Sequence, residues 1–283
     1  MEKKGLYSPE FEHDSCGIGF VANFKSNKSH RIISDSLTIL ENMEHRGACG
    51  CEINTGDGAG ILIQTPHEFF FDECLKLGIH LPSYGKYGVG VLFFPKEIRL
   101  REECREIFNR CAETLGLEVI GFRRIPVNTD EIGFTALSVE PEMEHVFIAC
   151  PDHINNADEF ERKLFVLRNY ASKTINNTVR KDAIGFYIAS LSYKTIIYKG
   201  QLTSRQLRGY FPDLSNKKIV SSFGLIHSRF ATNTFPSWKL AQPFRYIAHN
   251  GEINTLQGNL NWLRASEKNF ISQFFSKDEM EML

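Results

Sequence analysis

Apolar residues recur at helical spacing between residues 156 and 176, and this pattern constrains the fold more than any other feature of the chain. The recurring positions are Phe160, Leu164, Leu167, Ala171 and Ile175. Steps of three and four residues place these side chains on one side of a helix, which must be buried against another element. Asn156 precedes the pattern as the expected N-cap.

Short runs rich in β-branched and aromatic residues precede and follow this helix. They are YGVGVLFF at 87–94, HVFIAC at 145–150, AIGFYIASLS at 183–192 and TIIYKG at 195–200. Runs of this length, bounded by turn-forming residues, predict strands. The chain is therefore expected to mix α and β structure, and the order of the segments leaves the sheet topology open.

A strand and then a helix are expected near the start of the chain. The strand begins at Cys16, because apolar side chains occupy every second position of CGIGFVANF, which is typical of a half-buried strand. Those side chains are Ile18, Phe20, Ala22 and Phe24. Residues 30–44 are predicted to be helical, with Ser29 as N-cap. The apolar positions of this helix are Ile33, Leu37 and Leu40, with Ser36 and Met43 on the flank.

Charge and hydropathy argue against nucleic-acid and membrane partners. The 33 basic and 34 acidic residues give a formal net charge of -1, so a small-molecule substrate fits better than a polyanion. No apolar run is long enough for a bilayer span, and the first residues lack the apolar core of a signal peptide. Seven scattered cysteines without an export signal predict reduced thiols in a cytoplasmic protein.

Three segments concentrate small, polar and charged residues in a way that packing does not require. They are CGIG from residue 16, HSRFATNTFPSW from 227 and AHNGEINT from 248. In order and content they resemble the class II glutamine amidotransferases and, within them, the N-terminal domain of the glutamate synthases. The resemblance extends over nearly the whole chain from Cys16. The further segments that carry it are 43–60, 160–169, 189–200 and 240–259.

The resemblance implies an α+β fold of the N-terminal nucleophile hydrolase type, a four-layer αββα sandwich, with Cys16 as nucleophile at the mature N-terminus. A physical reason supports this processing. A free α-amine has a pKa of roughly 7.7 to 8.0, so the amine of Cys16 can accept the proton of its own thiol. While Ser15 is attached, that nitrogen is an amide and cannot do so. Residues 1–15 are therefore expected to be a propeptide, and residues 16–283 the amidotransferase domain.

The other site residues follow from what acyl transfer from glutamine requires. Asn250 and Gly251 are expected to donate N–H groups to the oxyanion that forms when the thiolate attacks the side-chain amide. Arg229 is expected to bind the α-carboxylate of glutamine, because a guanidinium offers a fixed fork of donors. Arg46 and Gly47, in the HRG motif, match family residues near the nucleophile and are carried over as catalytic support.

The resemblance also implies a larger enzyme. Glutamate and ammonia would be the products here, and the ammonia would add to 2-oxoglutarate in synthase and FMN domains of the same polypeptide, which also hold an iron–sulfur cluster. A small electron-donating subunit is a further expected partner. No cofactor or metal is expected in this chain. Two alternatives stay open: the glutaminase domain of another class II amidotransferase, and a non-catalytic interaction module of the same fold that is never processed.

The C-terminal region differs from the family pattern. In the family, an aspartate in a Ser-Asp-Ser-like segment binds the α-ammonium of the substrate, and no acidic residue after Asn250 stands in that context. Residues 260–283 continue with helical apolar spacing through Trp262, Phe270 and Phe274, without a Gly or Pro terminator. The chain is therefore expected to be a C-terminally incomplete domain that binds glutamine weakly.

Several other residues have a simpler structural interpretation. Cys49 and Cys51, near His45, are interpreted as structural thiols, because no second pair of metal ligands follows. His227 and His249 could form a Cys–His dyad, but local hydrogen bonding is favoured because the terminal amine supplies the base.

Three further features are also interpreted as structural. TGDGAG at 55–60 lacks a phosphate-loop spacing and is interpreted as a turn. Arg123 and Arg124 are expected to be a solvated pair at a strand start. Trp238 and Trp262 are expected to be buried.

Overall fold

The computed structural model describes residues 16–49, 52–179, 185–231, 234–245, 247, 249 and 256–283. Two compact units divide the chain, and each is assembled from three separate stretches of sequence. The first unit comprises Met1–Phe69, Ile125–Glu140 and Ile197–Asn250, and the second comprises Phe70–Arg124, Pro141–Ile196 and Gly251–Leu283. Neither unit is a continuous segment, which is why the sequence shows no internal boundary.

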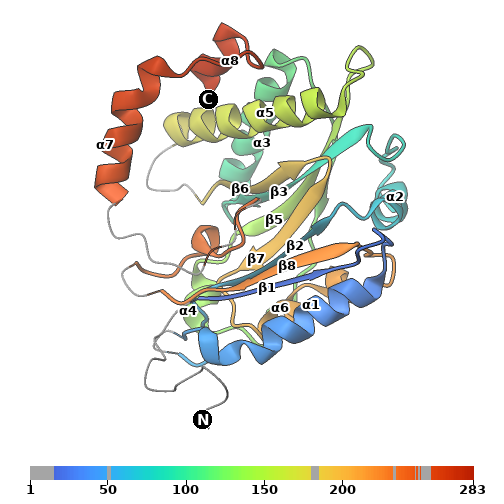
Figure 1. The fold of residues 1–283 in the computed structure, drawn as a ribbon, viewed down its shortest axis with the longest axis vertical. Helices are drawn as coiled ribbons and strands as arrows, with labels where there is room; N and C mark the ends of the chain where they lie inside the picture. The colour runs from blue at the N-terminus through green and yellow to red at the C-terminus, as the bar shows by residue number, and fades with distance from the viewer. Residues whose placement is uncertain are drawn as a thin grey trace. The chain divides into compact units, whose positions relative to one another are not determined.

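A four-stranded sheet with the order β1-β8-β2-β7 forms the centre of the first unit (Figure 1). Its strands are β1 (Gly17–Ala22), β8 (Phe223–Ser228), β2 (Ala59–Gln64) and β7 (Thr195–Gly200). β8 runs antiparallel to both of its neighbours, and Ser228 at its end pairs with Gly17 on one side and Ala59 on the other. β1 and β2 therefore both begin where β8 ends.

Helix α1 (His30–Asn42) packs along β1 and β8 (Figure 1). Its buried positions include the predicted Ile33, Leu37 and Leu40, so the predicted helix is confirmed. Ser29 occupies the N-cap position, but its side chain makes no capping hydrogen bond, and its backbone pairs with Ser221 instead. Close packing requires a glycine in β8, because a Cβ at Gly224 would lie 2.2 Å from Oγ of Ser36.

The strand predicted from Cys16 is confirmed as β1, but the predicted buried face is wrong. Phe20 is 62% exposed, and Phe24 lies beyond the strand and is fully exposed. β1 is an edge strand whose contact with α1 is made on the glycine side: a Cβ at Gly19 would lie 3.0 Å from a methyl carbon of Ile39. Alternation identified the strand, but it cannot tell which face a neighbouring helix covers.

Short helices complete the first unit. They are η2 (Glu44–Arg46), α4 (Phe134–Ser138), α6 (Gln206–Tyr210), η4 (Pro212–Ser215) and η5 (Trp238–Leu240). The predicted burial of Trp238 is confirmed: its ring packs 5.5 Å from that of Tyr210, and Nε1 donates to the carbonyl oxygen of Ala136. Trp238 thereby joins three of these short elements.

The second unit contains an antiparallel sheet with the order β4-β5-β3-β6. Its strands are β4 (Glu118–Arg124), β5 (Glu142–Ala149), β3 (Tyr87–Phe94) and β6 (Tyr187–Ser192). The strands predicted at 87–94 and 195–200 are present with those bounds as β3 here and β7 in the first sheet, and those predicted at 145–150 and 183–192 are present with shifted bounds as β5 and β6.

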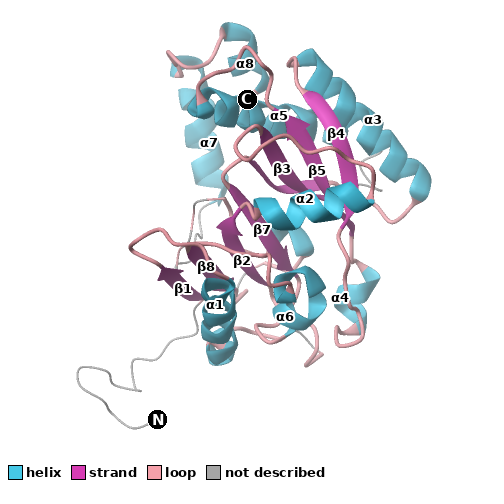
Figure 2. Ribbon diagram, turned by 90° about the vertical axis from the view of Figure 1, so that its right-hand side faces the viewer, coloured by secondary structure: helices cyan, strands magenta, loops and turns pink. Residues whose placement is uncertain are grey.

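Helices α5 (Ala157–Thr178) and α3 (Ile98–Thr114) pack against each other and against strands of this sheet (Figure 2). All five apolar positions predicted for α5 are buried, and Asn156 accepts a hydrogen bond of 2.8 Å from the backbone N–H of Asp158. The predicted helix and its cap are therefore confirmed. Burial of this apolar stripe, together with α3, forms the core of the second unit.

Helix α2 (His67–Lys76) contributes Phe70, whose ring lies 5.4 Å from that of Phe147 in β5. Nearby, Arg123 is 6% exposed and pairs with Glu73 at 2.8 Å. The side chain of Arg124 is 76% exposed and pairs with Glu142. The expectation of a solvated arginine pair is therefore wrong for Arg123, because consecutive residues of a strand point to opposite faces.

The C-terminal region contains α7 (Leu256–Ser266), η6 (Glu267–Asn269) and α8 (Lys277–Met282). The predicted continuation of the helix through Phe274 is wrong, since the helix ends at Ser266. Trp262 is 77% exposed, so its predicted burial is wrong as well. A salt bridge of 2.8 Å between Lys163 and Glu279 connects α5 to α8. Among the described helices, none combines the length and the apolar character that crossing a membrane requires.

Candidate active site

Cys16 lies at the beginning of β1, opposite the residues that follow β8. Because Gly17 pairs with Ser228 in the antiparallel register, Arg229 and Phe230 arrive beside Cys16. The backbone N–H of Phe230 donates to the sulfur at 3.4 Å, and the thiol lies 3.8 Å from the carbonyl oxygen of the same residue. The backbone of Phe230 therefore contacts the sulfur through both its N–H and its carbonyl oxygen.

Arg229 is 8% exposed and held by groups of the same unit. Nη1 donates to the carbonyl oxygen of Asp57 at 3.2 Å, and Nη2 donates to Oγ1 of Thr234 at 2.6 Å. Burial lowers the pKa of Arg229, whereas the neighbouring Asp57 and Cys16 raise it. A guanidinium has five N–H donors, more than these two contacts require, so the group can also bind a carboxylate.

Asp57 is a site residue that sequence reasoning missed, because TGDGAG was interpreted only as a turn. Its side chain is 4% exposed, and Oδ2 accepts a hydrogen bond of 2.6 Å from the backbone N–H of Ala231. Burial raises the pKa of Asp57, while that N–H and the charge of Arg229 lower it. The sequence feature that could have identified it is an acidic residue within a glycine-rich segment, 55–60, that already resembled the family.

Arg46 lies next to Gly17, and Gly47 lies next to Ser228 at the end of β8. A Cβ at Gly17 would be 3.1 Å from Cβ of Arg46. A Cβ at Gly47 would be 2.6 Å from Oγ of Ser228, which is hydrogen-bonded to Oγ of Ser204 at 2.9 Å. Glycine at position 47 therefore permits the close approach of this segment to the end of β8.

His227 is fully buried in β8, and its Nε2 lies 3.2 Å from the carbonyl oxygen of His249. Burial lowers the pKa of His227 to about 4, partly opposed by that carbonyl, so the imidazole is neutral near pH 7. The described contacts of the Cys16 sulfur are with Phe230. These contacts agree with the interpretation of His227 as a locally hydrogen-bonded residue.

Lys199 in β7 anchors the segment that leads toward His249. It is 1% exposed, and Nζ donates to the carbonyl oxygens of Ala241 at 2.6 Å and Lys239 at 3.1 Å. The ammonium also lies 4.2 Å from the centroid of the Phe244 ring, a cation–π contact. This buried cation fixes the path of the chain before residue 249.

Four of the six predicted site residues are thus brought together at one end of the β1-β8-β2 sheet: Cys16, Arg46, Gly47 and Arg229. The predicted oxyanion donors Asn250 and Gly251 lie outside the described residues, as do residues 1–15 and Cys51. Their roles stay predictions.

Comparison with known proteins decides the family. Residues 16–283 match the family described as glutamine amidotransferases class-II. The chain belongs to the class-II glutamine amidotransferases. The α+β class expected for this family is confirmed, with two sheets and their associated helices. The match begins at Cys16, the residue directly before β1.

This amidotransferase chain is similar to glutamate synthases. It is 45% identical over 280 residues to the glutamate synthase (NADPH) large chain of Bacillus subtilis, covering 99% of this chain and 18% of that protein. It is 45% identical over 291 residues to the glutamate synthase (NADH) of Saccharomyces cerevisiae, covering 100% of this chain and 13% of that protein. It is 41% identical over 258 residues to the chloroplastic ferredoxin-dependent glutamate synthase 2 of Arabidopsis thaliana, covering 90% of this chain and 16% of that protein. The chain spans less than a fifth of these relatives.

The other described thiols of the amidotransferase chain have environments unsuited to a nucleophile. Burial raises the pKa of Cys74 to about 12 and that of Cys104 to about 11. Burial also raises the pKa values of Cys49, Cys111 and Cys150. Thiols with raised pKa values carry little thiolate near pH 7 and are chemically inert.

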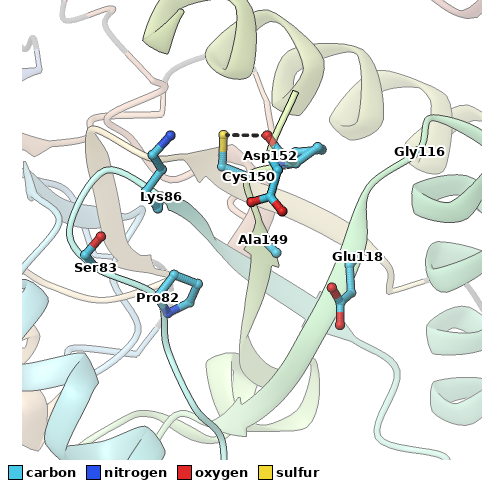
Figure 3. Close-up of a pocket in the computed structure, with 9 residues that line it drawn as sticks. Pro82, Ser83, Lys86, Gly116, Glu118, Ala149, Cys150 and Asp152 are labelled. Carbon is cyan, nitrogen blue, oxygen red and sulfur yellow. Dashed lines mark hydrogen bonds between the residues drawn. The ribbon is translucent and has the colours of Figure 1, made fainter. Parts of the chain in front are cut away.

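A pocket of about 440 Å³ in the second unit lies among Ser83, Lys86, Glu118, Cys150 and Asp152 (Figure 3). Its charged side chains are of both signs, and its thiol lies 3.8 Å from the carbonyl oxygens of Pro151 and Ile154. This arrangement does not resemble a site for acyl transfer. Within the part of the chain that the structure describes, no three His, Cys, Asp or Glu side chains form a group that could hold a metal ion.

Proposed function

We propose that this chain hydrolyses glutamine to glutamate and ammonia through a γ-glutamyl thioester on Cys16. The observation that carries the proposal is the placement of the Cys16 sulfur 3.4 Å from the backbone N–H of Phe230, next to the guanidinium of Arg229. A nucleophile with a donor at its sulfur and a carboxylate-binding group beside it suits an amino-acid amide as substrate.

The reaction begins when the α-amine of Cys16, freed by cleavage of the Ser15–Cys16 bond, takes the proton of the thiol. The sulfur attacks the amide carbon, and Asn250 and Gly251 donate to the developing oxyanion. When the carbon–nitrogen bond breaks, the α-ammonium gives its proton to the leaving NH2 group, which departs as ammonia, and the α-amine is restored. Water then hydrolyses the thioester to glutamate and the free thiol.

The remaining residues position these groups. Arg229 binds the α-carboxylate and selects glutamine over simple amides. Arg46 and Gly47 support the segment beside the nucleophile, and residues 1–15 are the propeptide of a domain that spans 16–283. The family match from residue 16 supports this division.

In the larger enzyme, we place the ammonia product in a synthesis of glutamate from 2-oxoglutarate. The glutamate synthase relatives support this step. The synthase and FMN domains, the iron–sulfur cluster and a small electron-donating subunit belong to the rest of that assembly. The relatives are named for NADPH, NADH or ferredoxin, so each of these donors is compatible with the proposal. We place the protein in the cytoplasm on the strength of its reduced cysteines, although some relatives are named chloroplastic.

The N-terminal mass and the glutaminase activity of one preparation test the proposal. Active protein should begin at Cys16, and Cys16→Ser should lower glutamate release by at least about 1,000-fold. Cys150→Ser, at a partly buried cysteine of the second unit, is the control and should keep wild-type activity. Hydroxylamine should capture the thioester as γ-glutamyl hydroxamate in the wild type. An active protein with an intact Met1 terminus would end the processing proposal, and an unprocessed protein without glutaminase activity would favour the non-catalytic module.

The substrate role of Arg229 has a separate test. Arg229→Lys should raise the KM for glutamine by about 10- to 100-fold, because a point charge replaces a fork of paired donors. An equal loss of activity with glutamine and with a simple primary amide would contradict a role in binding the α-carboxylate.

A further inference from the structure

Phe230 lies between two residues that both hydrogen-bond to Asp57. On one side, Nη1 of Arg229 donates to the carbonyl oxygen of Asp57 at 3.2 Å. On the other, the backbone N–H of Ala231 donates to Oδ2 of Asp57 at 2.6 Å. Phe230 itself presents its N–H and its carbonyl oxygen to the sulfur of Cys16. The backbone that touches the nucleophile is thus held from both ends by one aspartate.

Asp57 is in turn fixed to the framework of the unit. Its backbone N–H donates to the carbonyl oxygen of Ala48 at 3.0 Å, which connects it to the segment after Gly47. The carbonyl oxygen of the next residue, Gly58, accepts the backbone N–H of Arg229 at 2.8 Å. Asp57 therefore links the segment around residue 47 with the 229–231 segment, and Cys16 contacts the latter.

A carboxylate at position 57 can hold the 229–231 segment more firmly than a neutral side chain. Oδ2 is buried and accepts a short backbone hydrogen bond, and a charged acceptor makes a stronger bond than a neutral one. The guanidinium of Arg229 beside it balances the buried charge. A neutral side chain at position 57 would lose both effects.

We propose that Asp57 is a positioning residue for the Cys16 nucleophile, holding Arg229 and Ala231 so that the N–H of Phe230 stays directed at the sulfur. Its substrate-level consequence rests on the proposed glutaminase function. The consequence for the thiol itself does not, because the contact joins Cys16 to the backbone of Phe230 and involves groups of this chain alone.

The test is the rate of iodoacetamide alkylation of Cys16 as a function of pH, measured by peptide mass spectrometry on the full chain after its N-terminus has been established. Asp57→Ala should raise the midpoint of the alkylation profile by about one pH unit, which lowers the rate below the midpoint about 10-fold. Asp57→Asn keeps an oxygen acceptor and should fall between Asp57→Ala and the wild type.

Asp213→Asn is the matched control. Asp213 is also 4% exposed and accepts a hydrogen bond of 3.0 Å from the hydroxyl of Tyr198, away from the 229–231 segment. This variant should keep the wild-type alkylation profile even where its thermal midpoint falls. If Asp57→Ala does not fold, the test uses Asp57→Asn instead: its alkylation profile should be shifted relative to that of Asp213→Asn.

The outcomes separate the two proposals. Wild-type alkylation profiles in both Asp57 variants would overturn the positioning role, whatever their stability. A wild type that hydrolyses no glutamine would defeat the proposed function, while a shifted profile in Asp57→Ala would still support the positioning of the thiol. Where both hold, the Asp57 variants should lower kcat for glutamine more than they raise KM.

Discussion

Nζ of Lys199 lies 2.6 Å from the carbonyl oxygen of Ala241, and this hydrogen bond joins β7 to the segment that leads toward His249. Lys199→Met removes the donor to the carbonyl oxygens of Lys239 and Ala241, and the bond to Ala241 is buried. The free energy of unfolding should fall by about 3 kcal/mol, because a buried acceptor loses a charged donor. Urea denaturation measures this loss.

Lys194 supplies the control for Lys199. Its side chain is 41% exposed and pairs with Asp158 at 2.9 Å, so Lys194→Met should cost less than about 1 kcal/mol. Equal losses in the two variants would contradict an anchoring role for Lys199.

Gly47→Ala should destabilise the protein and lower its activity. The new Cβ would lie 2.6 Å from Oγ of Ser228, so the segment beside Cys16 must shift, at a cost of about 1 to 3 kcal/mol. Adding Ser228→Ala removes the clashing oxygen and should restore more than half of the lost stability. Gly209→Ala is the control, since a Cβ there has no neighbour nearer than 3.9 Å. A double variant no better than Gly47→Ala would place the strain elsewhere.

The adjacent arginines of β4 form a matched pair for measuring burial. Arg123→Met breaks the pair between the buried guanidinium and Glu73 and should cost about 2 to 3 kcal/mol, because Glu73 then keeps only its ion pair with the exposed Lys76. Arg124→Met removes an exposed charge and should cost less than about 1 kcal/mol. Thermal and urea midpoints of the two variants report the difference, and similar values would show that burial does not govern the Glu73 pair.

His227 should make stability depend on pH between about 4 and 6.5. Burial lowers the pKa of His227 from 6.5 to about 4, so within this range the unfolded chain binds a proton here that the folded chain does not. The contribution is complete above pH 6.5 and is lost as the pH falls, by up to about 3 kcal/mol. His227→Gln should flatten this part of the curve, whereas His80→Gln, at an exposed histidine, should keep the slope of the wild type. Unchanged slopes in His227→Gln would contradict the shift.

Local patterns predicted the helices and strands that have strong periodicity. The apolar stripe of α5 and its Asn156 cap are local properties, as are the β-branched runs of β3 and β7. Patterns failed where a neighbour decides the outcome. Which side of β1 is covered depends on α1, and the buried position of Arg123 depends on Glu73. A strand's own alternation does not show which of its faces the next helix covers, and Glu73 lies in another element, α2.

The sequence by itself determined the family and the identity of Cys16, Arg46, Gly47 and Arg229 as candidate residues, because these reside in short motifs that a linear comparison can match. Only the tertiary structure decided what surrounds them. Asp57 is separated from Ala231 by 174 positions, and the two meet because β2 and β1 both begin where β8 ends. Antiparallel pairing of distant strands brings such groups together, and no local pattern encodes that register.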